Sequence, residues 1–235
     1  MISVCIATYN GETYIKQQVD SILIQLCAED ELIVSDDHST DSTMSILKSF
    51  NDSRIKIFLN NNKKGVVGNF ENALMNAHGC VIFLSDQDDI WLPNKISVSL
   101  DALKKNDLVV TNCEVINEKS EVIYLSYFKY ANSGKGFIKN IYKSSYLGCC
   151  LAFNRNVLDK ILPIPKSLLL FHDWWIGFIA ESLFKTEFID IICMQYRRHQ
   201  SANSTTISKS KNSLLLKITF RVQLLYLGLK RYIQK

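Results

Sequence analysis

The chain has 235 residues, 47% of them hydrophobic, and a formal net charge of +4 from 27 basic and 23 acidic side chains. Such a chain can bury a substantial core, which excludes a disordered protein and fits one large α/β domain or a domain with an appendage. Because the charges nearly balance, no overall field marks a nucleic-acid-binding protein, and nucleic acid is not an expected partner.

Short apolar runs alternate with helical patterns through the first hundred residues. Strands are predicted at 2–8, 31–35, 54–60 and 80–86, and helices, from apolar residues at helical spacing, at 12–26, 42–50 and 65–77. This alternation predicts an α/β fold with a Rossmann-like, mainly parallel sheet, helices on both faces and right-handed crossovers. In such sheets ligands bind beyond the carboxyl ends of the strands.

Beyond Pro93 the pattern is less regular, and the polar, aromatic stretch 118–146 fits neither period. The later segments predict a helix at 95–105, a strand at 107–116 and a strand leading into a helix at 147–161. They also predict a polar pair before a helix at 168–184 and a final strand at 187–199. There is no internal repeat and no long linker. We expect one domain at 1–205, with halves 1–105 and 106–205, and a helical tail at 206–235.

The seven cysteines lie mostly inside apolar runs, without the paired C-x-x-C spacing of zinc sites, which predicts buried, reduced thiols. The opening residues, MISVCIATY, carry no basic leader and run straight into a polar turn. We therefore expect neither a signal peptide nor a membrane span, and a cytoplasmic protein.

Polar side chains follow three of the predicted strands directly: Tyr9 and Asn10, Asp36 and Asp37, and the acidic run 86–89. The carboxyl ends of parallel strands meet at one edge of a sheet, so these clusters should lie close together. Three such clusters at one edge indicate a binding site rather than three unrelated turns.

The acidic run belongs to FLSDQDDIWLPNK (83–95), in which Asp86, Asp88 and Asp89 repel one another unless a cation, arginines or open water lie between them. One alternative is a turn that caps the helix starting near Pro93, but a single Asp suffices for a cap. Mg²⁺ or Mn²⁺ prefers such oxygen ligands, together with substrate phosphates. The run therefore predicts a divalent cation that bridges the carboxylates to a diphosphate.

These residues resemble the family 2 glycosyltransferases, which have the GT-A fold. The resemblance lies in SVCIATYNGETYIKQQVDSIL, ELIVSDDHSTDST, GVVGNFENAL and FLSDQDDIWLPNK, in that order, and in the later LGCCLAFNR and HDWW. Within the family, SDQDDIW is most similar to rhamnosyltransferase-type and other bacterial polysaccharide enzymes. The resemblance implies a nucleotide-sugar-binding half at 1–105 and an acceptor-binding half at 106–205.

On the donor side, the resemblance implies that Ala7 and Tyr9 hold the base and ribose of a UDP- or dTDP-sugar and that Asp37 accepts from the ring N–H of the base. Glu12 is a further candidate in the first loop. Asn69, near the exit of the third strand, is a candidate contact for the nucleotide.

For the cation, the resemblance implies Asp88 as a ligand of Mn²⁺ or Mg²⁺, with Asp86 near the ribose or the metal shell. Asp89 has the alternative role of serving the helix start. Family members often carry a histidine at the end of the last core strand, which makes His199 a second metal candidate, and its neighbours Arg197 and Arg198 suit a diphosphate.

Asp173, in FHDWW, falls where the family keeps its general base, which takes the proton of the acceptor hydroxyl. The resemblance thus implies a single in-line displacement with inversion, in which the cation stabilises the departing diphosphate. Without the other motifs, Asp173 would read equally well as a helix-start Asp. His172 departs from the more frequent Glu-Asp pair, and its role stays open.

The tryptophans at 91, 174 and 175 invite two interpretations, stacking against sugars or packing in the core, and we expect core packing for at least one. In the first interpretation Trp91 shapes the donor pocket, and Trp174 or Trp175 shapes the acceptor side.

The tail carries no Asp or Glu from Lys209 onward, and an apolar set recurs there at helical spacing: Leu215, Ile218, Val222, Leu225 and Leu229. This pattern indicates an amphipathic helix that lies on an anionic membrane surface or packs on the core with a basic face in water.

The expected activity is transfer of one sugar from a nucleotide-sugar to a glycan, lipid-linked through undecaprenyl diphosphate, in the synthesis of a bacterial surface polysaccharide such as O-antigen or capsule. Such an enzyme would work in the cytoplasm or peripherally on the inner face of the plasma membrane. Two alternatives are a nucleotidyltransferase, which would want a glycine-rich basic loop after the first strand, and a non-catalytic binder, which needs no base.

Overall fold

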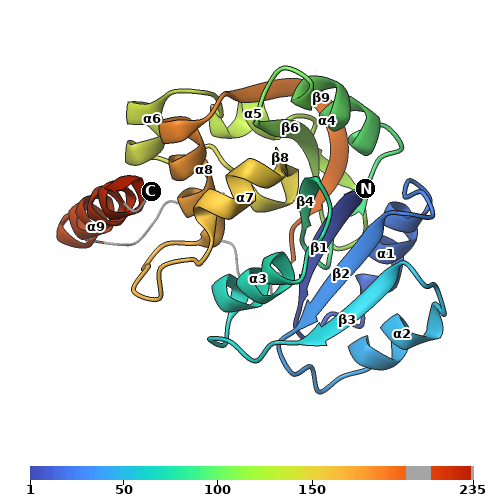
Figure 1. The fold of residues 1–235 in the computed structure, drawn as a ribbon. Helices are drawn as coiled ribbons and strands as arrows, with labels where there is room; N and C mark the ends of the chain where they lie inside the picture. Colours follow the sequence, from blue (N-terminus) through green and yellow to red (C-terminus); the bar gives the residue numbers. More distant parts are fainter. Residues whose placement is uncertain (200–212, 234–235) are drawn as a thin grey trace.

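Parallel strands alternating with helices form the first half of the protein, as predicted (Figure 1). The computed structural model describes residues 1–199 and 213–233. The elements of this half are β1 (Ile2–Thr8), α1 (Ile15–Leu23), β2 (Glu31–Asp36), α2 (Thr43–Ser49), β3 (Ile55–Leu59), α3 (Val66–Met75) and β4 (Val81–Ser85). These strands pair in parallel in the order β3-β2-β1-β4.

In the described residues, the second half continues the same sheet with four antiparallel pairs and one parallel pair. Its elements are β5 (Ile90–Trp91), α4 (Lys95–Leu103), β6 (Leu108–Ile116), β7 (Val122–Tyr124), α5 (Tyr127–Ala131), α6 (Phe137–Tyr142), the 3₁₀ turn η1 (Gly148–Cys150), β8 (Leu151–Asn154), α7 (Arg155–Ile161), α8 (His172–Leu183), β9 (Thr186–Arg197) and α9 (Leu214–Ile233). Strand β8 pairs antiparallel with both β4 and β6, and β6 pairs in parallel with β9.

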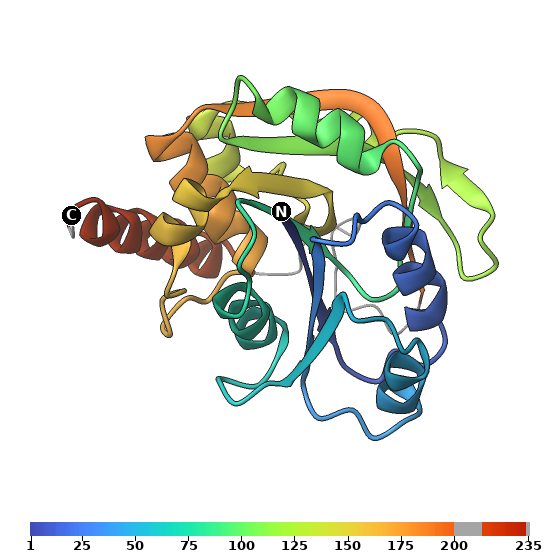
Figure 2. The ribbon, with the colours of Figure 1, turned by 45° about the vertical axis from the view of Figure 1, so that its right-hand side comes forward.

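The sheet curls, and helices cover both of its faces. Figure 2 shows α1 and α2 on one face of the β1–β4 half and α3, with α7 and α8, toward the other. Residues of β1 and β2 are almost all buried, because helices cover both faces of the sheet there, and the middle of each strand is accordingly apolar. The GT-A-like, mixed α/β architecture expected from the sequence is therefore present.

The stretch 118–146, which the sequence leaves unassigned, forms the β6–β7 hairpin and the short helices α5 and α6. Helix α6 packs on α8. Its Asn140 side chain donates to Glu181 of α8 at 3.0 Å, and the indole N–H of Trp174 donates to the Asn140 carbonyl at 2.8 Å. This segment therefore ties the start of α8 to the rest of the second half.

Helix α9 packs on α8 (Figure 1), but not through the apolar set named from the sequence. The inner face consists of Leu224, which is fully buried, and Gly228, where an added Cβ would lie 2.1 Å from the ring of Phe178. On the same side Arg231 donates to the carbonyls of Leu162 and Pro163. The predicted basic face in water is thus wrong, because the face that α9 exposes is apolar.

The predicted boundary between residues 205 and 206 lies outside the described residues. Among the helices of the described part, none combines the length and hydropathy that crossing a bilayer requires. All seven cysteines are free thiols, as expected, although Cys27 and Cys80 are exposed rather than buried.

Candidate active site at the carboxyl ends of β1, β2 and β4

The loops that follow β1 and β4 are joined by Gln87. Its side-chain amide accepts from the Tyr9 N–H at 2.9 Å and donates to the Tyr9 carbonyl at 3.1 Å. A Cβ at Gly11 would lie 2.4 Å from the Gln87 Oε1, so only glycine leaves room for this contact. The Tyr9 side chain itself is exposed. Two of the predicted polar clusters therefore meet, through a residue that sequence reasoning passed over because it stands between two carboxylates.

Asp36 and Asp37 divide into a structural and an accessible carboxylate. Asp36 is fully buried and accepts from the hydroxyls of Thr8, at 2.9 Å, and Ser39, at 2.6 Å. The Asp37 N–H donates to the Thr8 carbonyl at 2.9 Å, while its partly exposed carboxylate accepts from the Gly65 N–H at 2.8 Å. Of the pair, Asp37 is the one placed to meet a ligand at the end of β2.

The other donor-side candidates lie close by. Ala7 is partly exposed near the end of β1. Asn69 is only 2% exposed and donates to the Thr8 carbonyl at 2.9 Å, and Glu12 accepts from the Ser42 N–H at 2.8 Å, at the start of α2. The contacts of Asn69 and Glu12 in the structure are thus to the backbone that shapes the site.

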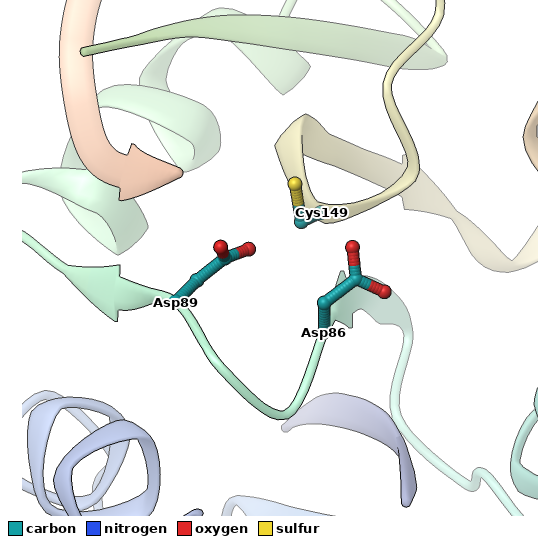
Figure 3. Close-up of side chains that lie close together, drawn as sticks. All are labelled: Asp86, Asp89 and Cys149. Carbon is teal, nitrogen blue, oxygen red and sulfur yellow. The ribbon is translucent and has the colours of Figure 1, made fainter. Parts of the chain in front are cut away.

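The side chains of Asp86, Asp89 and Cys149 point toward one another (Figure 3), with one ligand atom from each lying within 4.8 Å of the others. Asp89 is fully buried; its Oδ1 accepts from the Arg197 N–H at 2.9 Å, and its Oδ2 has no hydrogen-bond partner. The alternative role of Asp89 at the helix start is wrong, because α4 begins only at Lys95.

The two carboxylates of this cluster have raised pKa values. Burial, followed by the charges of Asp88 and Asp173, raises the pKa of Asp86 to about 8, and burial also raises the pKa of Asp89 well above its usual value. Grouped carboxylates shift in this way when no cation balances them. An orphaned buried oxygen and converging acidic side chains fit a divalent cation, with oxygen donors that suit Mg²⁺ or Mn²⁺ and a sulfur that softer cations prefer.

Asp88 and His199, the two predicted metal ligands, contact each other: the His199 Nε2 lies 2.6 Å from the Asp88 Oδ2. The hydrogen bond to Asp88 is the main reason that the pKa of His199 is raised. The structure therefore brings both residues together beside the Asp86–Asp89 pair.

The suggestion that Arg197 reaches a diphosphate is wrong. Its side chain is 1% exposed and donates to the carbonyl of Asp88, at 2.8 Å, and to the Ser120 hydroxyl, at 2.9 Å. Its guanidinium also lies 4.5 Å from the centre of the Tyr14 ring. Arg197 fixes the backbone of the acidic loop instead.

Asp173 lies in the first turn of α8, close enough to the acidic loop for its charge to raise the pKa of Asp86. Its carboxylate accepts from the Trp174 N–H at 2.7 Å. Burial raises the pKa of Asp173 to about 6. Asp173 is thus a helix-start residue and at the same time a carboxylate poised to exchange a proton near neutral pH.

His172, next to it, is buried and stacks on Phe70, with ring centroids 4.0 Å apart. Neither ring nitrogen has a hydrogen-bond partner, and burial lowers the pKa of His172 to about 3. The imidazole is therefore neutral.

Two of the tryptophans belong to the core. Trp91 is 3% exposed and packs on Phe83, and Trp175 is fully buried with its indole N–H donating to Ile161 at 3.0 Å. The sugar-stacking interpretation is wrong for these two, whereas Trp174 stays partly exposed.

Sequence reasoning also missed Lys95, which is fully buried and donates from its Nζ to the Cys149 carbonyl at 2.9 Å. It holds in place the turn that brings the Cys149 sulfur to the acidic pair. Its position at the end of the quoted acidic motif was the available signal.

Comparisons with known proteins identify the family and the fold. A family model described as "Glycosyl transferase family 2" matches residues 3–162. The chain is 32% identical over 211 residues to "UDP-Glc:alpha-D-GlcNAc-diphosphoundecaprenol beta-1,3-glucosyltransferase WfgD" of Escherichia coli, covering 87% of this chain and 80% of that protein. It is 28% identical over 248 residues to "dTDP-rhamnosyl transferase RfbG" of Shigella flexneri, covering 96% of this chain and 78% of that protein.

Among solved structures, S. aureus TarS 1-349 in complex with UDP-GlcNAc is similar with a TM-score of 0.67 and 19% identity, over 99% of this chain and 72% of that chain. The mannosyltransferase PcManGT from Pyrobaculum calidifontis, in complex with GDP-Man and Mn²⁺, is similar with a TM-score of 0.61 and 16% identity, over 100% of this chain and 64% of that chain. These likenesses show the fold.

The family match overturns the two alternative functions, a nucleotidyltransferase and a non-catalytic binder. It covers both the β1–β4 half with the acidic loop and the β8 segment that faces it. The chain is a member of glycosyl transferase family 2, a glycosyltransferase with the GT-A fold.

Proposed function

We propose that this enzyme transfers one sugar, with inversion, from a nucleotide-sugar to a hydroxyl of a lipid-linked glycan during synthesis of a bacterial surface polysaccharide such as O-antigen or capsule. The observation that carries the proposal is the position of Asp173, whose pKa is about 6, beside the acidic loop after β4. The names of WfgD, WfaP and a Campylobacter jejuni relative describe transfer to diphosphoundecaprenol- or PP-undecaprenol-linked glycans, which supports this acceptor class.

The donor site is formed by the ends of β1 and β2. Ala7 and the exposed Tyr9 line it, with Glu12 and Asn69 holding the surrounding backbone. The Asp37 carboxylate accepts from the Asn60 amide at 2.7 Å and from the Gly65 N–H at 2.8 Å, and in this proposal its remaining lone pairs accept from the base. A UDP- or dTDP-sugar fits the names of the relatives and the UDP-GlcNAc complex of TarS.

Asp173 is the general base. Near pH 7 a carboxylate with a pKa of about 6 is mostly ionised yet more basic than an ordinary Asp. It takes the proton of the acceptor hydroxyl while that oxygen forms a bond to the anomeric carbon and the bond to the nucleoside diphosphate breaks on the opposite face. Such a base contributes roughly 10²- to 10⁴-fold to the rate.

The acidic loop holds the cofactor in this proposal, with Asp88 and His199, which contact each other, as its ligands and with Asp86 and Asp89 close by. A bound Mn²⁺ or Mg²⁺ would neutralise these carboxylates and stabilise negative charge on the departing diphosphate. The chain's own contribution is geometric, because Gln87 anchors the loop to Tyr9 and Arg197 holds the carbonyl of Asp88.

A lipid-linked acceptor is presented at a membrane surface. We therefore infer that the enzyme works in the cytoplasm or peripherally at the inner face of the plasma membrane.

The test is release of nucleoside diphosphate from a panel of UDP-, dTDP- and GDP-sugars, with a glycosylated lipid diphosphate as acceptor and with or without Mn²⁺. Turnover should require metal and fall at least tenfold in Asp88→Ala, because a ligand is lost. Asp101→Ala, which removes an 80% exposed carboxylate far from the loop, is the matched control and should keep full activity. Turnover that is indifferent to chelation and to Asp88→Ala would remove the metal from this account.

A further inference from the structure

Helix α9 exposes a continuous apolar face. The side chains that form it are between 44% and 75% exposed: Leu214, Leu215, Ile218, Val222, Leu225, Tyr226, Leu229, Tyr232 and Ile233. At about 100° per residue they fall within an arc of roughly 120° on the helix surface. At the same spacing the inward-packing Leu224 and Gly228 lie outside this arc, roughly 40–80° beyond one of its edges. The helix is therefore apolar on a second face that nothing in the described residues covers.

The short helix α6 extends this face. It exposes Ile138 to 82% and Tyr142 to 74%. Arg221 of α9 joins the two helices, because its guanidinium donates to the Tyr142 carbonyl and lies 5.3 Å from the centre of the Tyr142 ring. We call the exposed side chains of α6 and α9 together the α6–α9 surface.

The two helices that carry this surface have basic side chains and no acidic ones. No Asp or Glu occurs in residues 122–158 or 213–233, the segments that contain α6 and α9. Exposed lysines stand on these helices and at their ends, at Lys139, Lys143 and Lys230. A wide apolar arc flanked by basic residues, on helices that themselves carry no acidic residue, is the pattern of helices that lie in the interface of an anionic bilayer, where each Lys or Arg is worth about 1 kcal/mol.

The two helices that carry this surface also contact the residue next to the proposed base. Trp174, which follows Asp173, donates to the Asn140 carbonyl of α6 at 2.8 Å and lies with its ring 5.9 Å from the Arg221 guanidinium of α9. Both helices therefore contact the first turn of α8 from the side.

We propose that the α6–α9 surface docks the enzyme on an anionic lipid bilayer and thereby delivers the lipid-linked acceptor to Asp173. This inference rests on the proposed function for its acceptor. Apolar side chains of α9 and α6 enter the interface, the lysines meet lipid phosphates, and the glycan leaves the bilayer beside α8.

The test is flotation of the full chain with vesicles of phosphatidylglycerol and phosphatidylcholine, compared with phosphatidylcholine alone. We expect binding to the anionic vesicles that weakens as the salt concentration is raised, because salt screens the attraction between the lysines and the lipid phosphates. Two double variants, Leu225→Ser with Leu229→Ser and Ile138→Ser with Tyr142→Ser, should each weaken binding at least tenfold, because they remove apolar area from the interface.

Ile24→Ser is the matched control: Ile24 is 84% exposed at the end of α1, on another part of the molecule, and its loss should leave binding unchanged. All of these side chains are exposed, so the variants should fold, which circular dichroism checks. The inference is overturned by absence of binding to anionic vesicles, by equal binding of the variants, or by a dimer that the same variants abolish.

Turnover on a water-soluble acceptor separates this inference from the proposed function. The α6 and α9 variants should keep that turnover while losing turnover on vesicle-borne acceptor. If the unaltered enzyme binds vesicles but transfers no sugar to any acceptor, the proposed function fails instead. If the variants match the unaltered enzyme in turnover on both the water-soluble and the vesicle-borne acceptor, the proposed role of this surface in delivering the acceptor is overturned.

Discussion

Gln87 binds the N–H and the carbonyl of Tyr9 with the two ends of one amide group, at 2.9 and 3.1 Å. A residue in the middle of the acidic loop thereby sets the position of the loop that follows β1. The two loops belong to neighbouring parallel strands, so the donor-side and metal-side candidates are held as one unit.

Replacing Gln87 with Ala should raise the KM for the nucleotide-sugar roughly 30-fold, with a smaller change in kcat. Two hydrogen bonds of roughly 1 kcal/mol each are lost, and each 1.4 kcal/mol corresponds to a factor of ten. Steady-state kinetics over a range of donor concentrations measures this. Gln25→Ala, which removes an amide just after α1 that donates to the Ser21 carbonyl at 3.0 Å, should leave the KM unchanged. An unchanged KM in Gln87→Ala would show that the loops keep their place without this contact.

Asp173→Asn should lower turnover by about 10²- to 10⁴-fold and spare donor affinity, because the general base is lost and the donor loops are untouched. In the unaltered enzyme, kcat/KM for the acceptor should fall as the pH drops through about 6, where the carboxylate becomes protonated. Initial rates from pH 5 to 8, with donor binding by calorimetry, test both. A flat profile across pH 6 would contradict the assignment of the base.

The same substitution should stabilise the protein at neutral pH. The folded-state pKa of Asp173 is raised to about 6 from an ordinary value of 3.8, so the folded protein favours the protonated form. The contribution of this group to the free energy of unfolding is complete below about pH 4 and is lost as the pH rises through 6. Asp173→Asn should therefore raise the melting temperature at pH 7.5 but not at pH 4, which calorimetry at the two pH values measures. An equal shift of the melting temperature at both pH values would show that burial of the charge is not the cause.

Arg197→Lys should lower the free energy of unfolding by roughly 2–4 kcal/mol. The guanidinium donates to several groups at once, including the Asp88 carbonyl and Ser120, and an ammonium group cannot satisfy that fork. Urea denaturation measures the loss. Arg198→Lys, at a partly exposed neighbour, should stay within about 0.5 kcal/mol of the unaltered protein. A similarly small effect at position 197 would mean that the buried contacts are replaceable.

Sequence alone predicts the first half of the fold well, because its strands are buried on both faces and stand out as apolar runs between helical patterns. The convergence of Tyr9 and the acidic loop follows from parallel pairing, and the structure brings these segments together through Gln87. The second half of the fold is harder to predict from sequence, because β8 runs antiparallel between β4 and β6 and no local pattern specifies that strand order.

Residue roles in the site are predicted less well where burial decides them. Arg197 looks like a phosphate ligand in sequence, yet it is buried under the acidic loop, and Trp91 is buried in the core. In α9 the periodicity reveals an apolar stripe but not which side packs: Leu224 turns inward, whereas Leu225, one position later, turns outward. Tertiary contacts alone make that choice.

The insertion of β8 between β4 and β6 has a consequence for how new specificities arise. Residues of β8 pair with both neighbours, Ala152 opposite Phe83 on one side and Val109 on the other, so an added or deleted residue there would slip two ladders at once. The segments 125–146 and 162–171 carry no such constraint. Divergence among relatives in the glycans they extend should therefore accumulate as length changes in these two segments, leaving the strand frame untouched.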